Sequence, residues 1–266
     1  MAATGAEPPA MDDNAIACAD LLRRADPERF RAVMAAPVAA RARLFAIYAF
    51  NAEVARAPWG TAEPMIAEMR LQWWRDVVAG IAAGEAPPRQ PVARALAAAI
   101  RKEDTALLDA LVVARRWDIG RAPFAEMDAL RDHLQRSAGN LLLVAARSLG
   151  EAPEEPLRAA GFAMGLAAWL RAVPALRRAG RQPLIEETPE ALRALAEEGL
   201  ARLAEARAAR ARIPPPVRPA LLAVCTAGPV LRRVRADPRR VAEARLELPP
   251  IRSRLALIAR AATGRW

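Results

Sequence analysis

Apolar residues recur at helical spacing along most of this chain, and proline or glycine interrupts the pattern at short intervals. Apolar positions that recur every three or four residues predict helices, whereas a half-buried strand alternates with a period of two. An aspartate or a first-turn proline precedes several of these segments, as at Asp26-Pro27 and Pro37, and both are helix-start signals. The expected helices cover about residues 13–24, 38–56, 63–83, 92–102, 105–117, 123–149 and 189–211.

The stretch from Gly161 to Ile185 is strongly apolar and leads into a basic segment, with no acidic residue between Glu155 and Glu186. Its small residues form one helix stripe at positions i, i+4, i+7 and i+11: Gly161, Gly165, Ala168 and Ala172. A stripe so small lets a second helix or a ligand approach closely. The pattern alone fits either a buried structural helix with a solvated basic end or one wall of a binding site.

Composition favours an all-α protein, because alanine is abundant and aromatic residues make up only 5% of the chain. We expect a flexible N-terminus over residues 1–12 and one helical domain over 13–266, continued through a kink at Pro214–Pro216. Cys18 and Cys225 are far apart in sequence, which favours a reducing compartment without a disulfide framework. His133 is the only histidine, so a histidine-based zinc site or triad is poorly supported and a structural role is favoured.

Positive charge is concentrated in the C-terminal quarter, where residues 207–266 contain 14 arginines and three acidic residues. Basic helices are expected from about residue 214, separated at Pro229, Pro238 and Pro249-Pro250. Such a region suits an anionic membrane surface or an acidic partner, or is simply a solvated face. Nucleic acid is disfavoured, since Trp266 is the tail's one aromatic residue available for base stacking. The longest uninterrupted apolar run, 159–170, is too short to span a bilayer, so we expect a cytoplasmic chain that can associate peripherally with the inner membrane.

Two segments resemble the motifs of the squalene/phytoene synthase family. The first is LFAIYAFNAEVARAPW, in which Tyr48, Ala49 and Phe50 match the family's Y-A-F before its first aspartate-rich cluster. The second is the stretch at 161–185, which matches the family's second motif at Gly161, Ala163, Leu166, Leu170, Arg171, Gly180, Arg181 and Leu184. In this register the family's acids fall on five other residues: Ala55, Arg56, Trp59, Ala172 and Leu176.

The resemblance implies an isoprenoid-synthase-type fold, a single all-α domain whose helices surround a central cavity. Members of the family join two prenyl diphosphates, using magnesium ions held by the two acid clusters. Carboxylates spaced i, i+4 share one helix face and supply the oxygen ligands that magnesium prefers. Because none of the five positions carries an acid, we expect no catalytic residues, no metal and no cofactor. The alternative is a magnesium-dependent prenyltransferase of the squalene or phytoene synthase type.

A further resemblance points to one branch of the family, which contains an assembly factor of respiratory complex I and also lacks the acid pairs. It rests on FNAEVA, MRLQWW, QPVA and LRAVP, found between Phe50 and Pro174. It implies a non-catalytic protein that works at the inner membrane surface, with a complex I subunit or assembly intermediate as partner and a prenyl or lipid-like molecule as a candidate ligand. The candidate cavity or ligand-binding residues are Asn51, Glu53, Arg70, Gln72, Asn140, Arg171 and Arg181.

Overall fold

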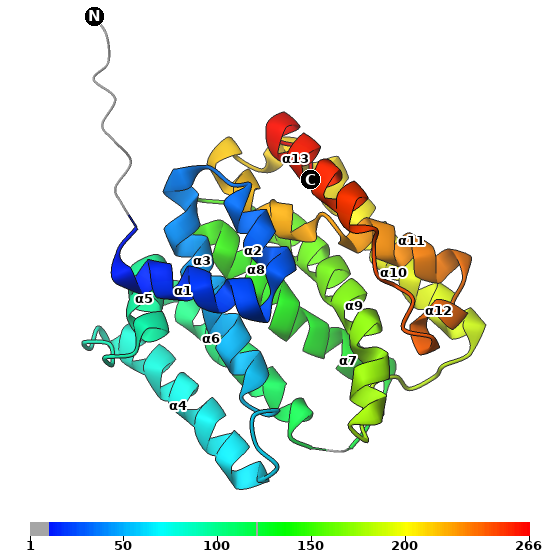
Figure 1. The fold of residues 1–266 in the computed structure, drawn as a ribbon, viewed down its shortest axis with the longest axis horizontal. Helices are drawn as coiled ribbons and strands as arrows, with labels where there is room; N and C mark the ends of the chain where they lie inside the picture. The colour runs from blue at the N-terminus through cyan, green and yellow to red at the C-terminus, as the bar shows by residue number, and fades with distance from the viewer. Residues whose placement is uncertain (1–10, 121) are drawn as a thin grey trace, which may run out of the picture.

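The structure, a computed structural model, describes residues 11–120 and 122–266, so most of the N-terminal segment expected to be flexible lies outside it. Every regular element in the described part is helical (Figure 1). The α-helices are α1 (Asp13–Ala25), α2 (Pro27–Met34), α3 (Val38–Arg56), α4 (Pro64–Ala83), α5 (Pro91–Ala99), α6 (Thr105–Ala114), α7 (Met127–Leu134), α8 (Asn140–Arg147), α9 (Glu154–Arg178), α10 (Pro189–Ala208), α11 (Ala227–Ala236), α12 (Arg239–Ala242) and α13 (Pro250–Thr263). The all-α prediction is confirmed.

Short helical turns that are not α-helical connect several of these helices. Four are 3₁₀ helices: η1 (Lys102–Asp104), η2 (Arg115–Asp118), η4 (Ala209–Arg212) and η5 (Pro215–Val224). The element η3 (Gln135–Gly139) is a π-helical turn between α7 and α8. The single helix expected over 123–149 is therefore three pieces in the structure. π-Helical turns are often found at functional sites, and η3 borders the cavity described below.

Two long helices form the centre of the molecule. Helix α3 packs against α1, α5 and α8, and α9 packs against α8, η3, α10 and α11 (Figure 1). Helix α9 is apolar around most of its circumference, which is typical of a buried helix. By length and composition it is also apolar enough to cross a membrane, but 72% of the apolar window is buried by the rest of the protein. Neighbouring helices therefore cover most of the apolar surface of α9 that would otherwise contact lipid.

The small-residue stripe of α9 meets a second helix along its first half. A Cβ atom added to Gly161 would lie 2.7 Å from the Cα of Gly139, and one added to Gly165 would lie 2.6 Å from the Cβ of Ala138. Both distances are far inside van der Waals contact, so glycine at these positions is what allows α9 and η3 to pack so closely. Further along the same stripe, Ala168 and Ala172 line open space instead. The first half of the stripe therefore allows close helix packing, and the second half forms part of a cavity wall.

The C-terminal region packs on α9 and α10 rather than standing apart. The chain does not break at Pro229 as expected, because this proline lies in the first turn of α11, where its missing N–H costs no helical hydrogen bond. Pro238 and Pro249-Pro250 do separate elements, namely α11, α12 and α13.

Candidate functional site

A cavity of about 450 Å³ lies between the C-terminal halves of α3 and α9 and the segment from η2 to α8. Apolar side chains form most of its surface, among them Leu134, Leu141 and Trp169. A cavity of this size and lining can take up a small amphipathic molecule. Two other hollows of similar volume in the described part of the chain have more polar linings.

Four of the five positions aligned with the family's acids line this cavity. Ala55 and Trp59 come from the end of α3 and the turn after it, while Ala172 and Leu176 come from α9. The structure therefore brings both motifs to one space, as the resemblance implies. Arg56 does not join them, because successive residues on a helix point about 100° apart and its side chain is largely exposed.

The charged groups of the cavity belong to residues that the motif comparison did not single out. Asp118 is 2% exposed and accepts a hydrogen bond from Arg115 at 3.5 Å. Burial raises the pKa of Asp118, while the charges of Arg115 and Arg181 oppose that rise. Arg29 reaches the cavity from α2, pairing with Asp26 at 3.0 Å. The polar part of this wall therefore contains more cations than carboxylates.

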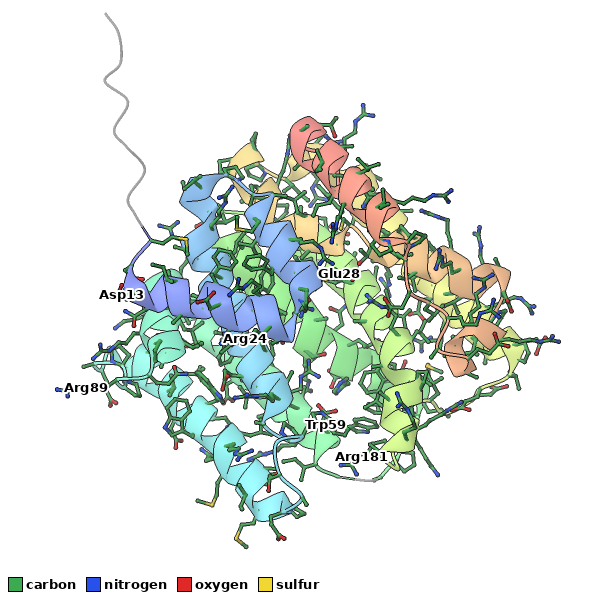
Figure 2. All side chains as sticks on the ribbon, in the orientation of Figure 1. Asp13, Arg24, Glu28, Trp59, Arg89 and Arg181 are labelled. Carbon is green, nitrogen blue, oxygen red and sulfur yellow. The ribbon has the colours of Figure 1, made fainter. Side chains whose placement is uncertain are left out.

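Arg181 contacts two residues of the cavity wall, Asp118 and Trp59. Its guanidinium donates hydrogen bonds to the main-chain oxygens of Asp118 and Ile119, at 2.7 and 3.3 Å. The same group lies over the ring of Trp59, and Figure 2 shows the two side chains close together. This cation–π contact joins the end of the first motif to the end of the second.

His133 is part of an aromatic wall that it shares with Trp117, Phe124 and Trp169. Its ring centre lies 5.0 Å from that of Trp169, whose indole N–H donates to the main-chain oxygen of Pro183 at 2.9 Å. Burial, together with the positive charge of Arg115, lowers the pKa of His133 to about 3. The imidazole is therefore neutral at physiological pH and serves as a packing group.

Asn51 is the candidate residue that reaches the cavity from α3. It is 4% exposed and lines the cavity, and its side-chain oxygen has no hydrogen-bond partner within the described part of the chain. A buried polar group without a partner costs free energy unless something else satisfies it. Asn51 is therefore placed to bind a polar group of a molecule in the cavity.

Three other residues singled out in the sequence line a separate, more polar hollow on the far side of α3, namely Glu53, Arg56 and Arg70. Glu53 pairs with Arg56 at 3.2 Å, and Arg70 reaches over Gly60 from α4. Arg171 lines a third hollow, where it contacts Glu28 at 2.9 Å and Glu247 at 3.3 Å. These four residues therefore lie in surroundings distinct from the central cavity.

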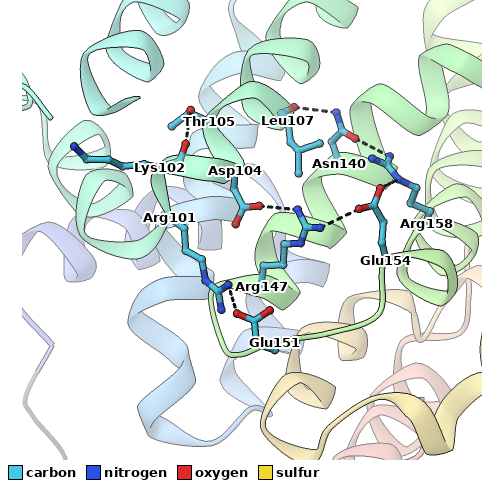
Figure 3. Close-up of polar contacts among 10 residues, drawn as sticks. All are labelled: Arg101, Lys102, Asp104, Thr105, Leu107, Asn140, Arg147, Glu151, Glu154 and Arg158. Carbon is cyan, nitrogen blue, oxygen red and sulfur yellow. Dashed lines mark hydrogen bonds and ion pairs between the residues drawn. The ribbon is translucent and has the colours of Figure 1, made fainter. Parts of the chain in front are cut away.

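The remaining two predicted residues take part in polar networks away from these hollows. Gln72 donates to the exposed Asp76 at 2.8 Å. Asn140 donates to the main-chain oxygen of Leu107 at 2.9 Å and accepts from Arg158 at 3.0 Å (Figure 3). Arg158 in turn contacts Glu154, which pairs with Arg147 and so connects to the buried Asp104. This network joins α8 to α9 and has a structural role.

The residues of the central cavity do not fit a magnesium cluster. Asp118 is the one carboxylate among its described lining residues, and it already contacts Arg115. No group of three or more potential ligands from His, Cys, Asp and Glu comes together anywhere in the described residues. A diphosphate held by magnesium needs several carboxylate oxygens in one place, which this donor set does not supply.

Arg115, Asp118 and Trp169 were not recognised from the sequence as cavity residues. The first two lie in a short 3₁₀ turn, outside the motifs that carry the resemblance. The one available signal was the cluster of charges around Trp117 at the end of an apolar helix. That cluster is equally typical of a solvent-exposed helix end.

The profile of the squalene/phytoene synthase family matches residues 22–188, which is more than half of the chain. The protein therefore belongs to the squalene/phytoene synthase family. The match covers α2 to α9 and the last turn of α1, and so includes both motif segments and the central cavity.

Within this family the chain is similar to curated proteins that are named as assembly factor 6 of NADH dehydrogenase (ubiquinone) complex I. It is 30% identical to the human protein over 162 residues, which is 59% of this chain and 48% of that relative. The Drosophila melanogaster homologue is 32% identical over 175 residues, or 62% and 51% of the two chains. The chain spans about half the length of the curated relatives that it matches.

Solved structures of similar fold include synthases. A dehydrosqualene synthase crystallised with a ligand superposes with a TM-score of 0.78, 18% identity and coverage of 94% of this chain and 95% of that one. A squalene synthase from Alicyclobacillus acidocaldarius gives a TM-score of 0.68 at 19% identity, over 84% and 93% of the two chains. At these identities the likeness establishes the fold alone, and it confirms the predicted isoprenoid-synthase-type architecture.

Proposed function

We propose that this protein assists the assembly of respiratory complex I and does not condense prenyl diphosphates. The observation that carries the proposal is its similarity to complex I assembly factors, at 30% identity over 162 residues for the human protein and 32% over 175 residues for the Drosophila melanogaster homologue. At the positions of the family's acids, alanine, tryptophan and leucine face the central cavity. A protein that keeps such a fold but lacks the ligands for a catalytic metal can still bind a partner or a ligand.

The central cavity is the proposed ligand site. Its apolar wall suits a prenyl or other lipid-like chain, and Asn51, Arg29 and Arg115 offer polar contacts to a head group. Without magnesium, hydrogen bonds donated by Arg29 and Arg115 would hold an anionic group, while the side-chain oxygen of Asn51 would accept from a donor on the ligand. The chain itself would act at the inner membrane surface, where the subunits of the complex are inserted.

The alternative, a prenyltransferase, predicts different chemistry. Departure of a diphosphate develops negative charge that needs strong stabilisation, which magnesium provides in the enzymes of this family. The arginines near the cavity contact backbone oxygens, carboxylates and aromatic rings instead, as seen for Arg29, Arg115 and Arg181. We infer that they favour binding over ionisation of a substrate.

Two measurements test the proposal together. Deleting the gene should lower the amount of assembled complex I and NADH-linked respiration, while carotenoid and hopanoid levels stay normal. Purified protein incubated with labelled farnesyl or geranylgeranyl diphosphate and magnesium should release no diphosphate. Normal complex I with missing isoprenoids, or turnover near the typical enzyme rate of about 10 per second, would overturn the proposal.

A further inference from the structure

Helix α13 presents a row of exposed aliphatic side chains on its outer face. Ile251 is 73% exposed, and Leu255 and Ile258 are each 62% exposed. Their spacing of four and three residues places them on one stripe of the helix, because such residues are neighbours on a helix surface. Large aliphatic side chains in contiguous exposed rows mark surfaces that meet another phase or molecule.

The inner face of the same helix is fixed to the body of the protein. Leu257 is buried, and Arg260 donates to the main-chain oxygen of Cys225 at 2.6 Å. Just beyond the helix, Trp266 is buried and its main-chain oxygen accepts from Arg207 at 3.1 Å. These contacts fix the inner face of α13 against the body of the protein, so the aliphatic stripe on the opposite face points outward.

Positive charge flanks the stripe. At 3.6 residues per turn, Arg252 and Arg254 lie about 90° and 70° to either side of its centre, and both are exposed. No acidic residue follows Glu247 in the sequence. Beneath the helix, burial and the charges of Arg260 and Arg232 lower the pKa of Arg207, which reports closely spaced cations.

We propose that α13 is an interfacial helix that lies in the plane of an anionic lipid bilayer, with Ile251, Leu255 and Ile258 inserted below the head groups. An aliphatic stripe between two flanks of arginine is the arrangement that binds such an interface, since the arginine stems follow the apolar side chains and their guanidinium groups meet lipid phosphates. The positive charge selects an anionic surface over a neutral one.

The exposed apolar residues of α4 make a useful contrast. Met65 and Met69 are 76% and 66% exposed, but Glu68 and Asp76 on the same helix remove the excess of positive charge. Helices α4 and α13 lie at opposite ends of the molecule (Figure 1). A membrane held by α13 therefore leaves α4 facing away from it.

This inference deepens the proposed function by naming the surface that would hold the protein at the membrane, and its test needs no complex I. The purified full-length chain is floated with phosphatidylcholine vesicles and with vesicles containing phosphatidylglycerol. We expect binding to the anionic vesicles, weakened by salt because the attraction is screened. Equal binding to both vesicle types, or binding to neither, would overturn the proposal.

Variants assign the binding to this helix. Ile251→Ser/Leu255→Ser/Ile258→Ser changes only exposed side chains and should weaken vesicle binding at least about tenfold, since apolar burial is lost. Arg252→Gln/Arg254→Gln should weaken binding to anionic vesicles by about fivefold per residue. The matched control, Met65→Ser/Met69→Ser on α4, should bind as the unchanged protein does. Undiminished binding by the α13 triple variant, or loss of binding by the control, would contradict the assignment.

A site-specific label reports insertion itself. Cys18 and Cys225 are buried, so a cysteine introduced as Leu255→Cys can be labelled selectively with an environment-sensitive fluorophore. Its emission should shift to the blue on anionic vesicles, whereas the same label at Met69→Cys should not respond. Vesicle binding without a blue shift at position 255 would show that the helix adsorbs by charge alone and does not insert, and this would overturn the proposal. If the label inserts but gene deletion leaves complex I intact, the helix assignment stands and the assembly role fails.

Discussion

The guanidinium carbon of Arg181 lies 5.6 Å from the centre of the ring of Trp59, a residue that lines the central cavity. Trp59 occupies a position aligned with an acid of the family's first motif, and Arg181 is a matching residue near the end of the second. A cation and an aromatic ring thus meet where the family's two acid clusters would face one another. The contact ties the end of α3 to the end of α9 without a metal ion.

Removing the Arg181 side chain should lower the stability of the protein, because this residue connects the segment after α9 to the segment after α3. Arg181→Ala loses the cation–π contact and the hydrogen bonds to Asp118 and Ile119, so the free energy of unfolding should fall by about 1–3 kcal/mol. Urea denaturation measures the change. Arg89→Ala, at an exposed loop residue, is the control and should stay within about 0.5 kcal/mol. Equal free energies of unfolding for the two variants would show that the contacts of Arg181 do not stabilise the protein.

Two buried asparagines should respond in opposite ways to the same substitution. Asn51 has a side-chain oxygen without a partner, so Asn51→Leu should leave stability unchanged or raise it by about 1 kcal/mol. Asn140→Leu should lower it by about 2 kcal/mol, because Leu107 and Arg158 each lose a hydrogen bond. Thermal and urea unfolding of both variants provide the comparison. A marked loss of stability in Asn51→Leu would indicate a structural role and weaken the case for a ligand contact.

His133 should make stability depend on pH on the acidic side. Its folded pKa of about 3 lies below the ordinary histidine value of about 6.5, so the unfolded chain binds the proton first as pH falls. Its stabilising contribution is therefore complete above about pH 6.5 and decreases as pH falls toward 3, with a slope of up to about 1.4 kcal/mol per pH unit.

The difference in unfolding free energy between the unchanged protein and His133→Phe isolates this slope from those of the carboxylates. Because the chain has a single histidine, its imidazole NMR signal also reports the pKa directly. Titration of that signal near pH 6.5 in the folded protein would contradict the prediction.

Arg171 should hold the C-terminal region to the N-terminal helices. It contacts Glu28 of α2 and Glu247, which precedes α13. Arg171→Glu would place a third carboxylate between them, and stability should fall by about 2 kcal/mol, less at high salt because like charges are screened. Glu28→Arg in the same chain should restore part of the loss, which a double-mutant cycle measures. No recovery in the double variant would mean that the contact is not electrostatic.

Much of the architecture was predictable because helical periodicity is a local property. Alanine abundance and the recurrence of apolar positions indicated the all-α class, and the motif residues around Tyr48 and Gly161 indicated the family. The same register showed that no acid stands at Ala55, Trp59, Ala172 or Leu176. Those predictions need only the identity and spacing of residues along the chain.

The tertiary structure decided which of these residues share a space. Sequence spacing shows that a helix face is buried, but the neighbours of that face come from distant segments, so Asn51 faces the cavity while Asn140 joins a network between α8 and α9. The same limit applies to the basic tail. Its charge was evident from composition, but the outward direction of Ile251, Leu255 and Ile258 depends on Leu257 and Trp266 being buried against the body. Packing selects one face of an amphipathic helix for the core, and only then is the remaining face defined as a surface.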